Sequence, residues 1–424
     1  MDDLAQCCLS HTCKSLYDIE RIAAMASFTQ LFFLASCLLS AAWGQPLDGV
    51  DNLLDRGLGH SFREACQAST RNPLQGCPKD TILVSATHKK ANFQTIQSAI
   101  ISLPNDDSAH TILILSGNYT EQLNITRPGP ITLLGETNHP HDATKNTVNI
   151  LWAAASAEGI YTDNVFTSVL IVAPTLNASL TGYGPSGLPV PEGTPFGCRD
   201  FRTYNLDFRN VYAEQSAGPA HALSFSRANG GFYFSGFYSF QDTVYVGKLG
   251  NAFFYESVIA GQTDFLYGFG TAWVEKSSLL LRGCGGGITA WKGSNTTYEN
   301  KFGIYIHDST IRAANASVAE ANEGNCALGR PWNSGHRSIF ARSYLDATIR
   351  GSGYILWSAP ITEQTLMGEF ENHGPGFDVE ARREWNYSVL LDEKEWRGYS
   401  SPRKVFLDED GASGNVGWID GRYR

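Results

Sequence analysis

The chain has 424 residues, of which 42% are hydrophobic and 17% are charged, so it is long enough to bury a large core. Its formal net charge of −10 excludes the broad basic face that nucleic-acid binding needs, and the interior of the sequence has no apolar run long enough to span a membrane. Forty-two glycines and 12% aromatic residues are typical of a β-rich protein with many tight turns. We therefore expect a partner that is neither nucleic acid nor membrane.

Residues 25–44 have the pattern of a secretory signal peptide, with an apolar centre followed by small residues up to Gly44. Residues 1–24 precede an internal methionine, and we interpret them as the product of a mispredicted start codon or as a disordered extension; a genuine membrane-anchoring or cytosolic extension is the alternative. Removing residues 1–44 leaves 38 acidic and 30 basic residues, a net charge of −8. We expect a secreted, extracellular protein that binds any anionic substrate through local groups in a cleft.

Five cysteines follow the signal segment, and Cys66 and Cys77 are close enough in sequence to close a small disulfide loop. The pairing of Cys198, Cys284 and Cys326 stays open. These cysteines show no CxxC spacing and no histidines at ligand intervals, so we expect no metal site. Glycosylation sequons begin at six asparagines: Asn118, Asn124, Asn177, Asn295, Asn315 and Asn386.

In chain order, residues 45–80 are polar and irregular, and we expect a lead-in followed by one domain over residues 81–424. Helical spacing of apolar residues over 93–100 predicts a helix that would cap the open end of a β-solenoid. Short β-type runs separated by Gly, Asn and Pro follow at residues 111–115, 131–134, 149–152, 205–208 and 302–306. We expect residues 283–300 to leave the path of the coils, and those after Gly374 to pack along the outside.

Two stretches in the middle of the chain repeat each other. Phe232-Tyr233-Phe234-Ser235 precedes Asp242, Phe254-Tyr255-Glu256-Ser257 precedes Asp264, and both features recur after 22 residues. A period this short, rich in aromatic and β-branched residues, favours one coil of a parallel β-helix. Because stacked coils lie about 4.8 Å apart, the repeat brings the two carboxyl groups side by side.

Two such carboxyl groups cannot both ionise easily, so the pKa of one rises while the other stays low. This division provides an acid together with a nucleophile or base, as hydrolysis by two acidic groups requires. The alternative is that both aspartates are turn residues that fall into register by chance.

The chain resembles the pectin methylesterases (pectinesterases) over roughly residues 93–376. The motifs that carry this resemblance occur in the family's order: Gly117-Asn118-Tyr119-Thr120-Glu121, Ile131-Thr132-Leu133-Leu134-Gly135-Glu136, Gln241-Asp242-Thr243-Val244-Tyr245, Asp264-Phe265-Leu266-Tyr267-Gly268, Leu328-Gly329-Arg330-Pro331-Trp332 and Asn372-His373-Gly374-Pro375-Gly376. It implies an all-β fold, a right-handed single-stranded parallel β-helix with an N-terminal capping helix. It also implies hydrolysis of the methyl esters of homogalacturonan (pectin), by a monomer without a cofactor.

By the same resemblance, Asp264 is the nucleophile, Asp242 the acid and then the base, and Gln241 the donor that stabilises the oxyanion. Arg330 would pair with Asp264, fix its orientation and lower its pKa. Arg330 lies 66 residues beyond Asp264, which corresponds to three coils and roughly 14 Å. The contact therefore requires residues that loop out, and the glycine-rich stretch from Gly283 is our candidate.

Tyr245, Tyr267 and Trp332 would form an aromatic wall of the cleft by the same resemblance. Stacked aromatic residues in a solenoid are more often core, so spacing alone favours packing for the two tyrosines. Trp332 is the best candidate of the three, because it follows Arg330 and Pro331 in an expected loop.

The chain also departs from the family pattern. Pro219 occupies the place of a second oxyanion glutamine, and proline has no side-chain hydrogen-bond donor. His221 lies two residues further on and is a candidate substitute in substrate binding, although a structural role is the alternative. Tyr267 replaces the usual phenylalanine, and Gln262 and Leu266 are also unusual.

The sequence leaves two rival functions open. A polygalacturonase or lyase shares the β-helix fold, but cleavage of a glycosidic bond does not need Gln241 beside the acid, and the sequence lacks the acidic cluster of a calcium-dependent lyase. The second rival is a non-catalytic pectin-binding protein, because Pro219 stands where the family has an oxyanion glutamine. Release of methanol from methylated pectin distinguishes it from an esterase.

Overall fold

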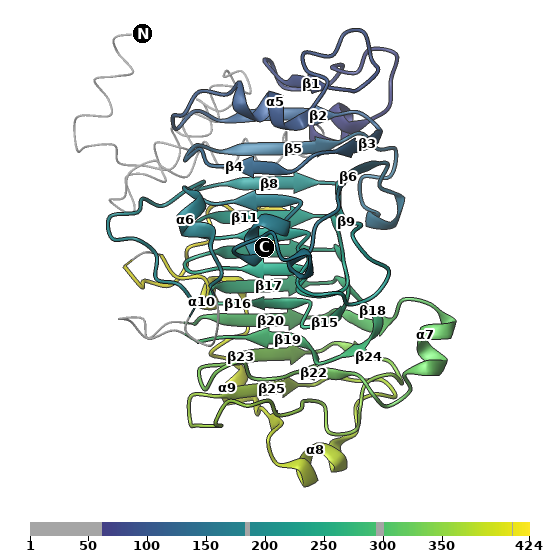
Figure 1. The fold of residues 1–424 in the computed structure, drawn as a ribbon, viewed down its shortest axis with the longest axis vertical. Coiled ribbons are helices and arrows are strands. Elements are labelled where there is room, and N and C mark those ends of the chain that lie inside the picture. Colours follow the sequence, from purple (N-terminus) through teal and green to yellow (C-terminus); the bar gives the residue numbers. More distant parts are fainter. Residues whose placement is uncertain (1–61, 183–186, 294–300, 409) are drawn as a thin grey trace, which may run out of the picture. The chain divides into compact units, whose positions relative to one another are not determined.

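The computed structural model describes residues 62–182, 187–293, 301–408 and 410–424, which belong to one compact unit, His60–Arg424. Residues 1–44, with the expected signal peptide, lie outside the described residues. Among the described residues, the strands form three parallel sheets of eleven, eight and seven strands, which we name sheets A, B and C (Figure 1). From β2 to β23 the chain passes from A to B to C and back to A on each coil, which makes a right-handed parallel β-helix and confirms the expected fold class.

The strands have the following bounds. Sheet A contains β1 Ile82–Val84, β2 His110–Ile114, β5 Ile131–Gly135, β8 Phe201–Tyr204, β11 Asn229–Tyr233, β14 Asn251–Tyr255, β17 Thr271–Glu275, β20 Gly303–His307, β23 Arg337–Ala341, β25 Leu366–Phe370 and β26 Val389–Leu390. Sheet B contains β3 Gly117–Thr120, β6 Val148–Trp152, β9 Asp207–Asn210, β12 Gly236–Tyr238, β15 Val258–Thr263, β18 Ser278–Gly285, β21 Thr310–Ala313 and β24 Tyr344–Leu345. Sheet C contains β4 Leu123–Ile125, β7 Leu170–Val172, β10 Leu223–Phe225, β13 Val244–Val246, β16 Leu266–Gly268, β19 Gly287–Trp291 and β22 Ala327–Gly329.

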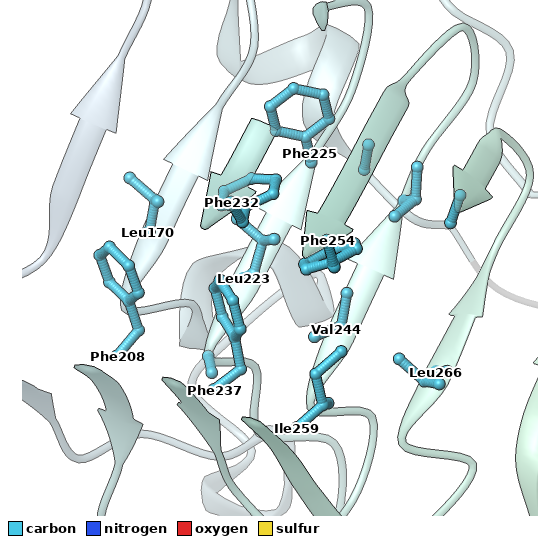
Figure 2. Packing of buried hydrophobic residues seen from close by; sticks show 14 of the residues in the cluster. Leu170, Phe208, Leu223, Phe225, Phe232, Phe237, Val244, Phe254, Ile259 and Leu266 are labelled. Carbon is cyan, nitrogen blue, oxygen red and sulfur yellow. The ribbon is translucent and has the colours of Figure 1, made fainter. Parts of the chain in front are cut away.

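The interior of the coils is filled by apolar side chains that stack from one coil to the next. Phe232 on β11 stacks on Phe254 on β14 at 4.8 Å, and Phe208 stacks on Phe237 at 5.4 Å (Figure 2). These side chains belong to one continuous cluster of buried residues. The 22-residue spacing of Phe232 and Phe254 is therefore the length of one coil.

A column of polar residues holds the corner between sheets A and B. The column contains Ser235, Ser257, Ser277, Ser309, Ser343 and Asn372. The backbone N–H of each of its serines donates to the side-chain oxygen of the next member, as in Ser235 to Ser257 at 3.2 Å and Ser257 to Ser277 at 3.0 Å. The residues directly before these serines have positive φ, and so does Asn205 at the same corner, with +55°. The expected strand over residues 205–208 is therefore wrong at its first two residues, because Asn205 and Leu206 form the bend between β8 and β9.

The helix α5, Ile96–Ile101, lies next to β1 at the end of the stack (Figure 1). The helix expected over residues 93–100 is confirmed, but its start is wrong, because Phe93 forms a β-bridge with Val84. Thr95 caps it by accepting a hydrogen bond from the N–H of Ser98, and Ile96, Ala99 and Ile100 are buried. The carboxylate of Glu121 accepts the N–H groups of Ile96 and Gln97. No helix among the described residues is long and apolar enough to cross a membrane.

The remaining helices lie between strands or after β25. They are η1 Ala143–Lys145, η2 Ser156–Glu158, η3 Asn164–Thr167, α6 Leu176–Ser179, α7 Ala316–Ala321, α8 Val379–Trp385, α9 Glu393–Trp396 and α10 Pro402–Val405. Residues 62–67 are helical too, so the expected irregular lead-in has regular structure in its described part.

The segment after Gly374 packs along the outside of sheet A. Trp396, Phe406 and Trp418 are buried in a cluster with Tyr204 and Tyr233, residues of the outer face of that sheet. This agrees with the expected external position, although β26 also adds a strand to sheet A.

Candidate active site

Asp242 and Asp264 occupy the same corner on two successive coils, between sheets B and C. Asp242 precedes β13 and Asp264 precedes β16, and these strands pair with Val244 opposite Leu266. Both aspartates adopt positive φ, +58° and +46°, and each is only 2% exposed. The 22-residue repeat thus places two buried carboxyl groups on neighbouring coils, in a backbone conformation that aspartate tolerates better than most residues.

Arg330 forms a bidentate ion pair with Asp264. Its Nε donates to Oδ1 at 2.9 Å and its Nη2 to Oδ2 at 2.6 Å, and the N–H of Gly287 also donates to Oδ1 at 3.1 Å. This contact was expected from the motif, but the net direction of the pKa shift was not. Burial raises the pKa of Asp264, and the hydrogen bonds from Arg330 and Gly287 only oppose that rise.

The pKa of Asp242 lies well above its ordinary value. Burial is the largest cause and the negative charge of Asp264 is the second, while Lys292 and Arg330 act in the opposite direction. Since Asp264 has a bidentate cationic partner and Asp242 feels the charge of Asp264, Asp264 ionises first. The pair therefore provides one carboxylate and one carboxylic acid.

The route from Asp264 to Arg330 is two coils long, not three. Leu266 of β16 pairs with Thr289 of β19, which pairs with Gly329 of β22. The expected excursion at residues 283–300 is wrong in its first part, because residues 283–291 belong to β18 and β19 apart from the corner at Gly286. The additional length comes from the connection with α7, from two extra residues in β18 opposite β15, and from the residues between β19 and β20, which include the second part of the expected excursion.

The glycines at the corner between β18 and β19 allow the chain to pass close to Asp264 and Arg330. A Cβ atom at Gly286 would lie 2.7 Å from Oδ1 of Asp264 and 2.8 Å from Cζ of Arg330, and its φ is +75°. A Cβ at Gly287 would lie 2.6 Å from Cα of Gly329. We missed this role from the sequence, where the triplet indicated a turn and not a close approach.

Of the aromatic residues near Asp264, Tyr245 and Tyr267 are buried, whereas Trp332 is partly buried and Trp357 is exposed. Tyr245 and Tyr267 are each 2% exposed and pack with Phe269 and Ala290, so the packing that their spacing favoured is confirmed and the place in the cleft wall that the resemblance implied is not supported. Trp332 is partly buried and stacks on Tyr267 with ring centroids 6.1 Å apart. The tyrosines therefore support Trp332 from beneath.

Trp357 is a surface aromatic residue that we missed from the sequence because no motif marks it. It is 38% exposed, and its ring lies 5.0 Å from that of Trp332 in an edge-on arrangement. Cζ of Arg330 lies 3.6 Å above the ring. Arg330, the partner of Asp264, thus lies against Trp357, which in turn contacts Trp332.

His221 is fully buried, and the structure does not place it where a substrate could reach it. Its Nε2 lies 2.6 Å from the hydroxyl of Tyr267 and its Nδ1 lies 3.1 Å from that of Ser168. Burial lowers its pKa to about 3, so the ring is neutral. The suggestion that His221 replaces the missing oxyanion donor is wrong. The two unusual residues, His221 and Tyr267, are instead partners of each other.

Gln241 lies directly before Asp242 and is partly exposed, while Pro219 lies on the neighbouring coil. The N–H of Ala220 donates to the carbonyl of Gln241 at 3.1 Å, and the carbonyl of Pro219 accepts from Ser156 at 2.9 Å. Gln262 holds the segment before Pro219, because its Oε1 accepts the N–H of Ser216 at 3.1 Å.

Lys292 is a buried cation that the motifs did not indicate. It is 2% exposed, and its Nζ lies 3.9 Å from the ring centre of Trp332 and 4.8 Å from that of Phe269. Burial lowers its pKa to about 8, although the charge of Asp242 acts to raise it.

The structure forms two disulfides among the described residues, Cys66–Cys77, the pair suggested by spacing, and Cys284–Cys326, whose pairing the sequence left open. Cys198 is buried and free. Of the sequon asparagines, Asn118, Asn177, Asn315 and Asn386 are exposed, Asn124 is partly buried and Asn295 lies outside the described residues. Within the described ranges, no group of three or more His, Cys, Asp or Glu side chains could hold a metal ion.

Comparisons with known proteins point to one family. The family described as Pectinesterase matches residues 194–410. Pectinesterase A of Emericella nidulans is 28% identical over 290 residues, which cover 68% of this chain and 78% of the relative. Probable pectinesterase A of Aspergillus niger is 29% identical over 301 residues, with 71% and 81% covered.

Solved structures agree with this match. The pectin methylesterase from Aspergillus niger is 25% identical with a TM-score of 0.62, and the similarity covers 82% of this chain and 98% of that one. The carrot pectin methylesterase, 20% identical with a TM-score of 0.60 over 80% and 94% of the two chains, shows the same fold. The chain belongs to the pectinesterase family, a family of carboxylic ester hydrolases.

Proposed function

We propose that this protein is a secreted pectin methylesterase that hydrolyses the methyl esters of homogalacturonan through an acyl-enzyme on Asp264. The observation that supports this most directly is the pair of buried aspartates on adjacent coils, of which only Asp264 has a bidentate arginine partner. In the proposed reaction, Asp264 is therefore the carboxylate and Asp242 the carboxylic acid, although both are buried aspartates.

In the first half of the reaction, the carboxylate of Asp264 attacks the ester carbonyl carbon and a tetrahedral oxyanion forms. The side-chain amide of Gln241 donates a hydrogen bond to this oxyanion. The carbon–oxygen bond to the methoxy group breaks, and Asp242 gives its proton to the departing oxygen to form methanol. The product of this half is an anhydride between the galacturonate carboxyl group and Asp264.

In the second half, Asp242 changes from acid to base. Once Asp264 is acylated it has no negative charge, so one cause of the high pKa of Asp242 is absent and Arg330 no longer has an anionic partner. Asp242 takes a proton from water, the oxygen attacks the anhydride carbon, and the bond to Asp264 breaks. The galacturonate carboxyl group is released and the carboxylate of Asp264 is restored.

Trp332 and Trp357 are the proposed contacts for the sugar rings of pectin. An indole face suits the C–H face of a pyranose; the two rings contact each other, and Arg330 lies against the ring of Trp357. Tyr245, Tyr267 and His221 act through Trp332 and do not touch the substrate.

The test is methanol release from highly methylated pectin by the purified protein. We expect turnover by the wild type, none by Asp264→Ala, and a loss of about 10²–10⁴-fold in Asp242→Asn. Asp200→Asn is the matched control, because Asp200 also has a bidentate arginine, Arg202, with both contacts at 2.7 Å, but lies outside the site. Normal methanol release by Asp264→Ala would contradict the assignment. Binding of pectin without methanol release by the wild type would favour the non-catalytic alternative that Pro219 raises.

A further inference from the structure

Arg282 on β18 reaches across a neighbouring strand to the segment that carries Gln241. Its Nη1 donates to the carbonyl of Ser239 at 2.9 Å, and its Cζ lies 3.7 Å from the ring centre of Phe240, the residue directly before Gln241. Strand β15 lies between β12 and β18, so these contacts span two strand spacings, or roughly 9.6 Å. The arginine therefore joins the coil of Gln241 to the coil two steps further on.

Arg282 is partly buried, and among the described residues it has no carboxylate partner. Arg209, on the same face of sheet B, is different: its Cζ lies 3.8 Å from the ring centre of Tyr238, but it also forms an ion pair with Asp207. The contacts of Arg282 therefore hold the segment before Gln241 and do not neutralise an acid.

The side chain of Gln241 lacks a hydrogen bond that would fix its direction. Within the residues that the structure describes, its amide has no hydrogen-bond partner, although its backbone is held by Ala220 and by a β-bridge to Thr263. Phe240 and Gln241 also border a hollow of about 10 Å³, which has room for about one water molecule. An oxyanion donor has to be aimed before the reaction, since a displacement of about 1 Å can change the rate about 10²-fold. The direction of this amide therefore depends on how the residues around it are held.

Arg282 also belongs to the segment that passes Asp264. It lies four residues before Gly286, and the N–H of Gly287 donates to Oδ1 of Asp264 at 3.1 Å. We propose that Arg282 is a positioning residue that holds Gln241 in place relative to Asp264, so that the amide of Gln241 meets the oxyanion. This inference rests on the proposed function, because the oxyanion role of Gln241 belongs to it.

A positioning role and a binding role predict different kinetics. The oxyanion exists only in the transition states and tetrahedral intermediates of the two half-reactions. A misaligned Gln241 should therefore lower kcat and kcat/KM equally and leave KM unchanged. If Arg282 instead bound a carboxylate group of pectin, its loss would weaken substrate binding and chiefly raise KM.

The test is a double-mutant cycle of Arg282→Met and Gln241→Ala, measured by methanol release from highly methylated pectin. We expect kcat to fall about 10²–10³-fold in Gln241→Ala and about 10–10²-fold in Arg282→Met, with KM unchanged in Arg282→Met. The double variant should be about as slow as Gln241→Ala alone, because no donor is left for Arg282 to position. Phe240→Leu, which removes the aromatic ring but keeps an apolar side chain, should give a smaller loss that also disappears in the Gln241→Ala background.

Arg312→Met is the matched control. Arg312 lies on β21, the next strand of sheet B, is exposed, and donates from Nη1 to the carbonyl of Ala313 at 3.4 Å. The change removes one positive charge from the same face, but the hydrogen bond that it breaks does not involve the segment before Gln241. Its activity should equal that of the wild type. Thermal unfolding of every variant separates loss of fold from loss of chemistry.

Two outcomes would overturn the inference. One is a multiplicative loss, in which Arg282→Met slows Gln241→Ala as much as it slows the wild type. The other is a rise in KM at unchanged kcat, which assigns Arg282 to substrate binding. Failure of the proposed function looks different, because the wild type itself would then release no methanol or Gln241→Ala would remain fully active.

Discussion

At the scale of single residues, the site depends on the absence of a side chain at Gly286. The corner between β18 and β19 passes so close to Asp264 that a Cβ at this position would meet both Oδ1 of Asp264 and Cζ of Arg330, at 2.7 and 2.8 Å. An added methyl group can be accommodated only if the aspartate or the arginine moves. The orientation of Asp264 therefore depends on a residue without a side chain.

We expect Gly286→Ala to lower kcat/KM by on the order of 10²-fold, because a shift of about 1 Å in a reacting group can have this effect. Gly324→Ala is the control: Gly324 also has positive φ, +66°, but nothing lies within 4 Å of its would-be Cβ. It should lose about 1–2 kcal/mol of stability from backbone strain and keep its activity. Steady-state methanol release and thermal unfolding of both variants measure this. Equal activity in the two would show that the close approach does not matter.

Which residues could be predicted from the sequence depends on whether their position follows the coil period. The proximity of Asp242 and Asp264 was predictable, because two residues that are one coil length apart along a solenoid lie side by side in space. Trp357 was not, because it follows an excursion whose length does not reveal where the chain returns. Lys292 was not, because no motif marks it, although it directly follows β19. The partnership of His221 and Tyr267, 46 residues apart, also required coordinates.

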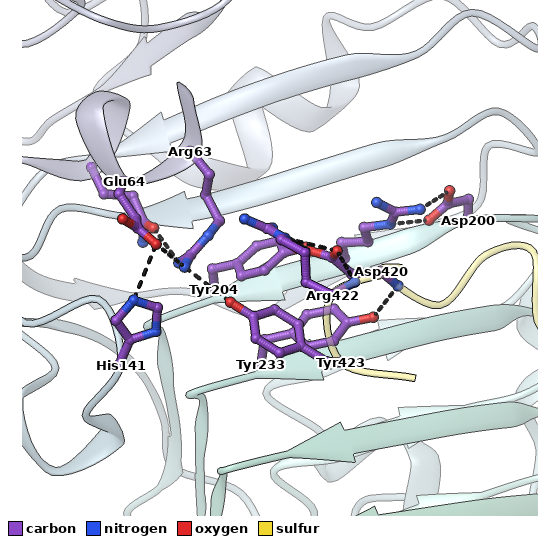
Figure 3. A network of polar contacts seen from close by, with 11 residues as sticks. Arg63, Glu64, His141, Asp200, Tyr204, Tyr233, Asp420, Arg422 and Tyr423 are labelled. Atoms are coloured by element: carbon purple, nitrogen blue, oxygen red, sulfur yellow. Dashed lines mark hydrogen bonds and ion pairs between the residues drawn. The ribbon is translucent and has the colours of Figure 1, made fainter. Parts of the chain in front are cut away.

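At the scale of elements, the C-terminal segment is held on the outer face of sheet A by Asp420. The hydroxyl of Tyr204 donates to Oδ2 of Asp420 at 2.7 Å, and the N–H of Asp420 donates to the hydroxyl of Tyr233 at 2.8 Å (Figure 3). Arg422 also donates to its carboxylate, with Nε at 2.9 Å from Oδ1. This one residue therefore joins the end of the chain to β8 and β11.

Burial acts to raise the pKa of Asp420, but hydrogen bonds from Arg422 and Tyr204 prevail and lower it to about 2. Because this lies below the value of about 3.8 in the unfolded chain, the contribution to stability is complete above pH 4 and is lost as the pH falls through 2. We expect Asp420→Asn to lower the free energy of unfolding by about 2 kcal/mol at pH 6.

Denaturant unfolding of Asp420→Asn and wild type from pH 6 to pH 2 measures this, and the difference between them should shrink below pH 4. Asp107→Asn is the control, since Asp107 forms an exposed ion pair with Arg199 at 3.0 Å, with 75% of the aspartate side chain exposed. An effect of Asp420→Asn no larger than that of Asp107→Asn would mean that the tail adds little to stability.

The sequence predicted the regular elements better than it predicted the connections. The capping helix and most strand positions followed from apolar periodicity, since each coil must bury the same interior face. Asn205 was misplaced because a single left-handed residue between two strands leaves the apolar pattern uninterrupted. The tail lacks a period, so its external position was predictable but the coils that it reaches were not.

At the scale of the whole molecule, the net charge opposes the reaction as it proceeds. The full sequence has a formal charge of −10, and the expected mature chain has −8. Each ester that is hydrolysed adds a negative charge to the pectin. Local cations such as Arg330 act at short range within the site, whereas the charge of the whole molecule acts on the approach of the substrate.

We therefore expect the initial rate of methanol release from lightly methylated pectin to rise as salt increases from about 10 to 150 mM, because the screening length shortens to about 10 Å at 0.1 M. Highly methylated pectin, with few carboxylates, should respond much less and is the internal control. At saturating substrate the difference should disappear, since repulsion affects encounter and not the chemical step. Equal salt responses of the two pectins would mean that contacts within the cleft, and not the charge of the whole molecule, govern binding.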